Sequence, residues 1–246
     1  MGGGKRMKDV LITGASSDVG TELIKHLGSK NESIRIFAHY NSSDEKIKAA
    51  AEAFSCMELR TFKADLKDIS QTQKLADELK EEGCAPEVFI YLPAPPFSYM
   101  RIKEYTPGSL DAAFCVGAES YICLCRAFLP AMKKSGGRVV VMLSSYVTDD
   151  MPPKFMTDYI VGKYALMGAM KASAAEYGSA ALKINAVAPE MMDTKFLDGI
   201  DPRIKEMNIA QAPAGRLLLP ADIMGAFDEL MSPDCELNGA LRRISL

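Results

Sequence analysis

A tyrosine and a lysine four residues apart offer the chemistry of proton transfer. The segment Tyr159-Ile-Val-Gly-Lys163 opens an expected helix over residues 158–177. This spacing places both side chains on one helix face, a turn apart. A phenol has an ordinary pKa of about 10, and a neighbouring ammonium favours its ionised form, which brings proton transfer closer to neutral pH. We therefore expect Tyr159 and Lys163 to be catalytic; a half-buried structural tyrosine is the alternative.

A hydroxyl group just beyond the preceding apolar run would complete this pair. The run Val139-Val-Val-Met-Leu-Ser-Ser145 ends 14 residues before Tyr159. We expect Ser145 to hydrogen-bond a substrate oxygen, and Ser144 remains open as its alternative.

A glycine-containing turn indicates an anion site. Thr13-Gly-Ala-Ser-Ser-Asp-Val-Gly20 joins the first expected strand to the first expected helix. Helix N-terminal amides and the helix dipole favour a bound phosphate at such a position, although a tight structural turn also needs glycine. The residues that we expect to contact a dinucleotide here are Gly14, Ser16, Ser17, Asp18, Val19 and Gly20.

The elements that must position these residues alternate along the chain. Apolar runs predict strands near residues 8–14, 33–39, 59–64, 87–92, 137–143, 182–187 and 240–244. Helical patterns occur near residues 18–27, 44–54, 70–82, 107–134, 158–177 and 221–231. Such apolar strands are buried on both faces, which indicates a parallel sheet covered by helices. We expect a disordered tail over residues 1–7 and, over 8–246, a single doubly wound α/β domain of Rossmann type with a mostly parallel seven-stranded sheet and helices on both faces.

Composition excludes several classes of function. The 246 residues carry a net charge of -3, so no basic excess exists to neutralise nucleic-acid phosphates. Six cysteines without a C-x-x-C pair, and only two histidines, argue against a zinc site or a secreted disulfide framework. The start of the chain has no apolar signal region and no window reaches the length of a membrane span. We expect no metal, no nucleic-acid or membrane partner, and a cytoplasmic location.

Together these segments resemble the short-chain dehydrogenase/reductase family, most closely its 3-oxoacyl-(acyl-carrier-protein) reductases. Thr13, Gly14 and Gly20 match the T-G-x-x-x-G-x-G fingerprint, and Ile184-Asn-Ala-Val-Ala-Pro189 resembles the family's V-N-x-x-x-P-G. The register between these segments favours Tyr159/Lys163 over the wider Tyr164/Lys171 pair. The resemblance implies reduction of a carbonyl group, 3-oxoacyl-type or related, by hydride transfer, with Tyr159 as proton donor and Lys163 also holding the nicotinamide ribose.

The resemblance also implies a cofactor. The second expected strand is followed by Asn41, Ser42 and Ser43, with no acid before Asp44, and this resembles enzymes that use NADP rather than NAD. NAD remains possible. Asp65 resembles the family's contact to the adenine edge. The further residues expected at the cofactor are Leu66, Pro93, Pro189, Met192 and Thr194, with Thr194 at the nicotinamide carboxamide.

The chain departs from the family pattern around the cofactor. Asp18 replaces the middle glycine, Gly117 stands where the family has a helix asparagine, and Tyr91-Leu-Pro-Ala-Pro-Pro96 replaces N-N-A-G. A catalytically weakened dinucleotide sensor or scaffold is therefore the alternative function. A sugar-nucleotide epimerase or dehydratase is disfavoured because 246 residues leave little room for its substrate domain.

The resemblance places an irregular lid at residues 190–216, and we use the word lid for this segment throughout. Its apolar side chains, which include Met191, Met192 and Phe196, suit a small-molecule or acyl substrate. The loop 147–158 adds Met151, Phe155 and Met156 beside Asp149 and Asp150. The resemblance further implies that the helices over 107–134 and 158–177 form the subunit interfaces of a homotetramer or homodimer.

Overall fold

The strands form one fully parallel sheet. The computed structural model describes residues 7–94, 100–148, 151–152 and 154–246. Its sheet has the order β3-β2-β1-β4-β5-β6-β7, and every neighbouring pair is parallel. The bounds are β1 Lys8–Thr13, β2 Ile34–Tyr40, β3 Met57–Lys63, β4 Val88–Tyr91, β5 Gly137–Met142, β6 Leu182–Pro189 and β7 Leu241–Ile244. The predicted Rossmann-type fold class is confirmed.

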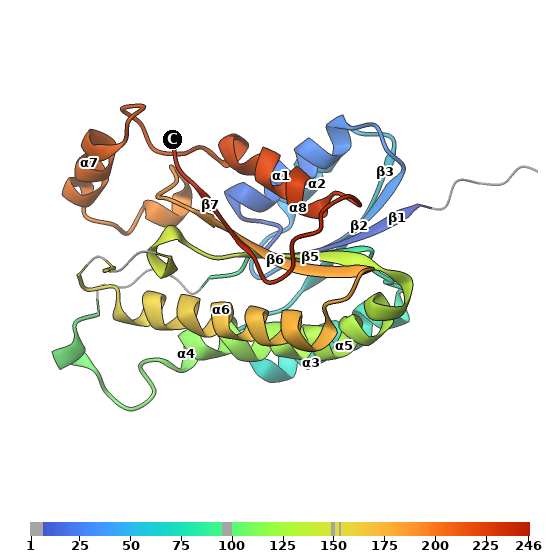
Figure 1. Ribbon diagram of the computed structural model, residues 1–246, viewed down its shortest axis with the longest axis horizontal. Coiled ribbons are helices and arrows are strands. Elements are labelled where there is room, and N and C mark those ends of the chain that lie inside the picture. Colours follow the sequence, from blue (N-terminus) through green and yellow to red (C-terminus); the bar gives the residue numbers. More distant parts are fainter. Residues whose placement is uncertain (1–6, 95–99, 149–150, 153) are drawn as a thin grey trace, which may run out of the picture.

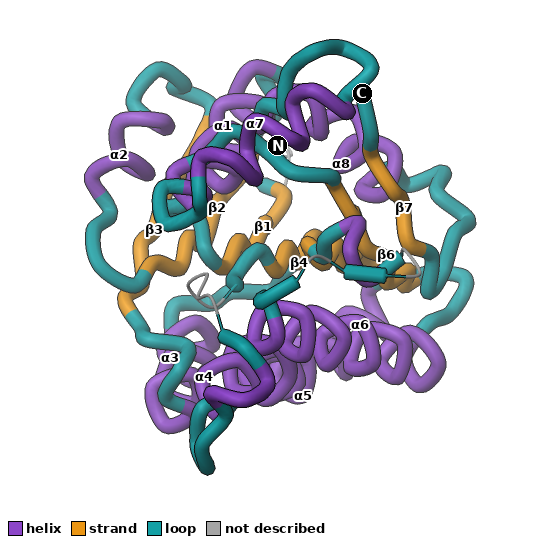
Figure 2. The backbone as a smooth tube through the Cα atoms, turned by 90° about the vertical axis from the view of Figure 1, so that its left-hand side faces the viewer, coloured by secondary structure: helices purple, strands orange, loops and turns teal. Residues whose placement is uncertain are grey.

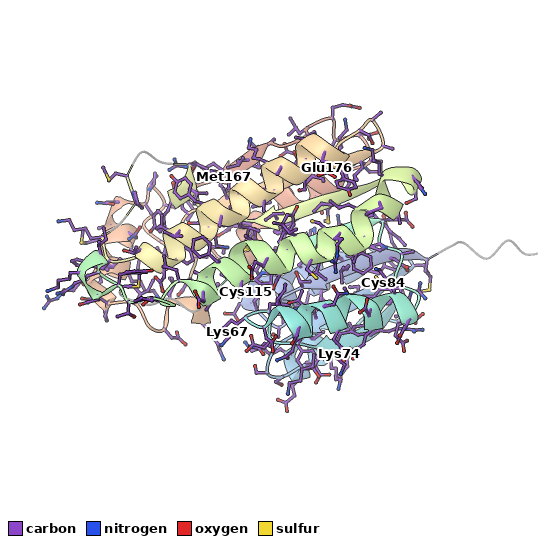
Figure 3. The ribbon with its side chains drawn as sticks, turned by 90° about the horizontal axis from the view of Figure 1, so that it is seen from below. Lys67, Lys74, Cys84, Cys115, Met167 and Glu176 are labelled. Atoms are coloured by element: carbon purple, nitrogen blue, oxygen red, sulfur yellow. The ribbon has the colours of Figure 1, made fainter. Side chains whose placement is uncertain are left out.

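Helices cover both faces of this sheet (Figure 1). One face carries α1 (Asp18–Ser29), α2 (Glu45–Ala51) and α8 (Met224–Met231). The other carries α3 (Ile69–Glu81), α5 (Ser120–Ser135) and α6 (Thr157–Tyr177), which run side by side in Figure 3. Two further helices, α4 (Asp111–Phe114) and α7 (Pro202–Gln211), flank the sheet.

Alternation along the strands builds a separate core on each face. In β1, Leu11 packs into the core with α3, α5 and α6, while Val10 and Ile12 pack into the core with α1 and α8. Because successive strand residues point to opposite faces, a continuous apolar run fills both cores. This double burial fixes the sheet between its two helical layers.

The long helix expected over residues 107–134 is divided. It consists of α4, a π-helical segment at Cys115–Glu119, and α5. By length and composition the combined stretch Asp111–Ser135 also passes a test for a membrane-spanning helix, but 56 % of its most apolar window is buried inside the protein. Core helices satisfy the same test, and this one packs between α3 and α6.

The lid is more regular than expected. It contains the 3-10 turn Lys195–Leu197 and the ten-residue helix α7, whose N-cap Asp201 accepts a hydrogen bond from the Arg203 amide. The expectation of an irregular segment was wrong because α7 lacks a buried face, so its sequence carries no apolar period.

All strands end at one edge, and this edge positions the site. Figure 2 faces it, with α7 above the strand ends and α4 below them. The chain order reverses between β1 and β4, since β2 and β3 lie on one side of β1 and β5 to β7 beyond β4. A crevice for ligands forms at such a reversal in open parallel sheets.

A metal site would draw on the cysteines and the other candidate metal ligands of the described residues. All six cysteines are free, with five buried and Cys56 half-buried. Within the described ranges, no group of three or more His, Cys, Asp or Glu side chains is arranged to hold a metal.

Candidate active site

A cavity of about 520 Å³ opens at the carboxyl edge of the sheet. Most of the residues that the sequence singled out line it: Gly14, Ser16, Ser17, Asp18, Val19, Asn41, Asp65, Leu66, Pro93, Tyr159, Lys163, Pro189, Met192 and Thr194. Gly20, Ser42 and Ser145 lie outside this lining. Residues that sequence reasoning had not assigned to the site also line it, among them His39, Lys46, Lys67, Tyr146 and Lys195.

The glycine turn is built for close backbone approach. Gly14 has a φ of +72°, a conformation that L side chains rarely adopt, and Ser17 caps α1 by accepting a hydrogen bond from the Gly20 amide at 3.0 Å. A Cβ on Gly20 would lie 2.6 Å from the Ala15 carbonyl oxygen. Gly20 therefore allows α1 to pack closely against the Ala15 backbone in the turn, and it faces this contact instead of the cavity.

A buried histidine holds this turn to the neighbouring strand end. The Gly14 amide donates to His39 Nδ1 at 3.1 Å, and His39 Nε2 donates to the Ala64 carbonyl at 3.0 Å. Burial lowers the pKa of His39 to about 4, so the imidazole is neutral at pH 7. Sequence reasoning missed this role, and the signal that could have indicated it is a polar residue near the end of an apolar strand.

The acid that follows the second strand is turned away from the cavity. Asn41 and Lys46 line the cavity there, while Asp44 turns to Thr61 and Lys48, at 2.9 Å from each. Hydrogen bonds from Lys48 and then Thr61 hold the pKa of Asp44 below its ordinary value. After this strand the described chain thus presents an amide and an ammonium to the cavity instead of a carboxylate.

Ser144, rather than Ser145, meets the tyrosine. The Ser144 side chain forms a hydrogen bond with Tyr159, and both residues line the cavity. Ser144 is also the N-cap of the 3-10 turn Ser145–Val147, so the chain turns directly after it. Ser145, the residue chosen from the sequence, is 2 % exposed and lines a second cavity of about 420 Å³ instead.

Burial dominates the protonation of Tyr159 and Lys163. The Lys163 ammonium lies 5.9 Å from the Tyr159 ring centroid and donates to the Met142 carbonyl at 2.9 Å. Desolvation lowers the pKa of Lys163 to about 7 and raises the pKa of Tyr159 to about 12, despite the hydrogen bond from Ser144. The sequence had led us to expect a lowered phenol pKa; in this structure the shift has the opposite sign because burial outweighs the hydrogen bond from Ser144.

Gly117 lies in the π-helical segment against α6. A Cβ at Gly117 would lie 2.4 Å from the Gly162 carbonyl oxygen, and a Cβ at Gly162 would lie 3.0 Å from the Ala113 carbonyl oxygen. The two backbones therefore touch where the family carries an asparagine side chain. No side chain at position 117 fits between these backbones as they stand.

The lid closes one side of the cavity. Thr194, Lys195 and Phe196 line it, and the Phe196 ring lies 5.7 Å from the Tyr159 ring. Met191, Met192 and Ile200 add apolar surface. Of the loop after β4, Pro93 and Ala94 line the cavity, while Pro96, Asp149 and Asp150 lie outside the described residues.

These features fit a dinucleotide. The positive-φ glycine turn and the start of α1 form a cradle for a diphosphate at one end. The buried Ser144, Tyr159 and Lys163 gather at the other end. The cavity volume falls within the range of small-molecule sites, about 300–1,000 Å³.

The chain is similar to many known oxidoreductases. A family model described as enoyl-(acyl carrier protein) reductase matches residues 14–238. An uncharacterized oxidoreductase, YmfI, of Bacillus subtilis is 27% identical over 228 residues, 92% of this chain and 91% of that protein. A 3-oxoacyl-(acyl-carrier-protein) reductase of Staphylococcus aureus is 24% identical over 223 residues, 89% of this chain and 88% of that protein.

Solved structures share the fold. Levodione reductase superposes with a TM-score of 0.83 at 23% identity, covering 98% of this chain and 97% of that chain. A Pseudomonas aeruginosa RhlG/NADP active-site complex gives a TM-score of 0.82 at 19% identity, covering 97% and 94%. At this level of identity the likeness establishes the architecture.

Proposed function

Because this chain belongs to the short-chain dehydrogenase/reductase family, we propose that it is an NADP-dependent oxidoreductase that reduces a carbonyl group to an alcohol. One observation carries the proposal: Ser144, Tyr159 and Lys163 gather at one end of a cavity whose other end is the glycine turn.

Ser144, Tyr159 and Lys163 mark what we call the reacting end of the cavity, and each has its own role in the proposed reaction. The hydroxyls of Ser144 and Tyr159, hydrogen-bonded to each other, are placed to hold one carbonyl oxygen between them. A reduced nicotinamide bound beside them would supply the hydride for the carbonyl carbon. Tyr159 Oη is the proton donor to the carbonyl oxygen in this proposal. The raised pKa of Tyr159 keeps that proton on the phenol at neutral pH, as a proton donor requires.

Lys163 contributes in two ways. Its pKa of about 7 lets it exchange protons near neutral pH, which suits it to reprotonating the phenolate left after each turnover. Its hydrogen bond to the Met142 carbonyl holds the side chain at the end of β5, where it is also placed to contact the nicotinamide ribose.

The proposed preference for NADP over NAD rests on the residues that follow β2, where the adenosine ribose of a dinucleotide would bind. With Asp44 engaged by Lys48 and Thr61, the described residues between β2 and α2 present no carboxylate to the cavity, where one would bind ribose hydroxyls or repel a 2′-phosphate. Asn41 and Lys46 line the same region, where the Lys46 ammonium is paired with Asp18 at 3.0 Å. Ser42, expected as a contact, lies outside the lining.

The proposed substrate is a 3-oxoacyl-type compound or a related ketone. Met156, Met191, Phe196 and Ile200 give the reacting end an apolar wall that suits an acyl chain. The similarity to a Staphylococcus aureus 3-oxoacyl-(acyl-carrier-protein) reductase supports the same class. A single domain over residues 8–246, a cytoplasmic location and a homotetramer or homodimer remain part of the proposal.

The test is oxidation of NADPH with a panel of 3-oxoacyl thioesters and simple ketones. Tyr159→Phe should lower kcat by about 10²–10⁴-fold, because it removes the proton donor while leaving the ring in place. Unchanged turnover by this variant would contradict the role of Tyr159. Tight binding of NADPH without turnover of any carbonyl would instead favour a dinucleotide sensor.

A paired substitution tests the choice of serine. Ser144→Ala should lower kcat about 10²-fold or more, because it removes a hydrogen-bond donor to the reacting oxygen. Ser145→Ala should leave kcat within about threefold of the wild type, since Ser145 faces the second cavity. A larger loss of kcat in Ser145→Ala than in Ser144→Ala would favour Ser145, the residue expected from the sequence.

A further inference from the structure

Asp18 joins two segments that lie far from it in the sequence. Its Oδ2 accepts a hydrogen bond from the backbone amide of Lys195, 177 residues away, at 2.8 Å. Its Oδ1 accepts one from Lys46 Nζ at 3.0 Å. All three residues line the cavity, so one carboxylate ties the glycine turn to α2 and to the lid.

The contact with the lid takes the place of a helix cap. Lys195 is the first residue of the 3-10 turn Lys195–Leu197, and the preceding Thr194 makes no side-chain cap hydrogen bond. The first amides of a helical turn need an acceptor from outside the turn, and a carboxylate is a strong one. Asp18 provides that acceptor from across the cavity.

The hydrogen bond between Asp18 and Lys195 also affects the reacting end of the cavity. Lys195 is followed by Phe196, whose ring lies 5.7 Å from the ring of Tyr159. Holding the Lys195 amide therefore fixes the turn that sets Phe196 against the proposed proton donor. The glycine turn and the reacting end become coupled through one hydrogen bond and one ring contact.

The charge of Asp18 is compensated where it stands. Partial burial acts to raise its pKa, but the Lys195 amide and the Lys46 ammonium outweigh this and hold the pKa below its ordinary value. Asp18 is also in the first turn of α1, where the helix dipole favours an anion. A diphosphate at this turn thus meets a carboxylate that is already paired.

We propose that Asp18 is a positioning residue that latches the lid turn Lys195–Leu197 across the cavity, so that a bound dinucleotide leaves only after the Asp18–Lys195 contact opens. The binding part of this inference rests on the proposed function. The latch itself is a property of the protein alone.

One matched pair of substitutions isolates the hydrogen bond. Lys195→Pro deletes the amide donor, and proline suits the first position of a helical turn, which here follows an extended Thr194 at φ -142° and ψ 161°. Lys195→Ala removes the same side chain but keeps the amide. Asp18→Gly deletes the acceptor and introduces the residue of the family fingerprint.

Hydrogen exchange of the protein alone tests the latch. The amides of residues 196–200 should exchange at least about tenfold faster in Lys195→Pro and Asp18→Gly than in Lys195→Ala and the wild type. Equal exchange in all four proteins would overturn the latch.

Stopped-flow release of NADPH tests its consequence. Release should be about tenfold faster from Lys195→Pro and Asp18→Gly, while Lys195→Ala releases at the wild-type rate. Equal release rates, with faster exchange at residues 196–200, would overturn the control of dinucleotide release. Failure of the wild type to bind NADPH or NADH would refute the proposed function and the control of release together, while the exchange result would still decide the latch contact.

Discussion

At the scale of single residues, burial decides which groups carry protons. His39, Tyr159 and Lys163 are 3%, 8% and 3% exposed, and in each case desolvation is the largest cause of the shifted pKa. For His39 and Lys163 the neutral form is favoured, and Tyr159 keeps its proton. The site at pH 7 is therefore less charged than its sequence suggests.

His39 makes the stability of the protein depend on pH. Its pKa of about 4 in the folded state lies below its ordinary value of about 6.5, so the unfolded chain binds more protons between these values. The stabilisation from neutral His39 is fully present above pH ~6.5 and is lost as the pH falls towards about 4, a loss of about 3 kcal/mol. Urea unfolding between pH 4 and pH 7 measures it.

Two variants serve as controls for this dependence. His39→Asn retains a donor and an acceptor without the titration and should flatten the profile. His26→Gln replaces the other histidine, a half-buried residue of α1 that is hydrogen-bonded to Asp228 of α8, and should retain the loss of stability towards pH 4. A wild-type profile that is flat between pH 6.5 and pH 4 would contradict the buried neutral imidazole.

The serines show the limit of prediction at this scale. Residue type and spacing placed the hydroxyl that contacts Tyr159 to within one residue. The choice between Ser144 and Ser145 depends on where β5 ends and the chain turns. Element boundaries are poorly determined by sequence patterns. His39 was missed for a related reason, since its two partners come from segments that only the folded sheet brings together.

At the scale of elements, the contact between Gly117 and Gly162 sets how closely the π-helical segment approaches α6. Glycine in a helix costs about 1 kcal/mol relative to alanine, so its presence needs a packing reason. Here the reason is the close backbone contact. The sequence identified Gly117 as a departure from the family, but not its partner, because the contact joins residues of different helices.

Alanine at this contact should destabilise the protein. Gly117→Ala places a methyl group 2.4 Å from the Gly162 carbonyl oxygen, so the helices must separate. We expect a loss of about 2–4 kcal/mol in the free energy of unfolding. Chemical denaturation measures this loss.

Gly168 provides the matched control in the same helix pair. Among the described residues, no atom beyond the adjacent residues and the backbone of the same helix lies within 4 Å of the place that a Cβ would take on Gly168 of α6, so Gly168→Ala should be neutral or stabilise by up to about 1 kcal/mol. Equal effects at positions 117 and 168 would show that the backbone contact does not constrain the helices.

At the scale of the whole molecule, the sheet and its two helical layers follow from patterns in the sequence. Apolar strand runs predicted the parallel sheet, and alternation of strands and helices predicted its winding. The helix α7 within the lid escaped prediction because it lies outside both cores and has no buried residues. Features held by the cores were predictable, and features held by long-range polar contacts were not.

The helical layer formed by α3, α5 and α6 also exposes apolar side chains. Phe114, Ile122 and Tyr164 are more than one-third exposed on α4, α5 and α6. Figure 3 views this layer, with Cys115 and Lys67 towards one end and Cys84 towards the other. The family resemblance leads us to expect a subunit interface on the same helices.

A charge in this layer should weaken subunit association. Ile122→Glu introduces a charge where an interface would exclude water, so light scattering should show a smaller assembly than for the wild type. A substitution at exposed Lys74 of α3, Lys74→Glu, is the control for charge alone. A wild type that is already monomeric would refute the homo-oligomer.

The central claim is that the phenol of Tyr159 and the ammonium of Lys163 face a nicotinamide at the carboxyl edge of the sheet. A crystal structure of the complex with NADPH measures this directly. The account predicts the diphosphate at the start of α1, the nicotinamide beside Ser144 and Tyr159, and Tyr159 Oη within about 3.5 Å of a carbonyl oxygen placed for hydride transfer. A nicotinamide bound away from Tyr159, or a dinucleotide seated outside this cavity, would contradict it.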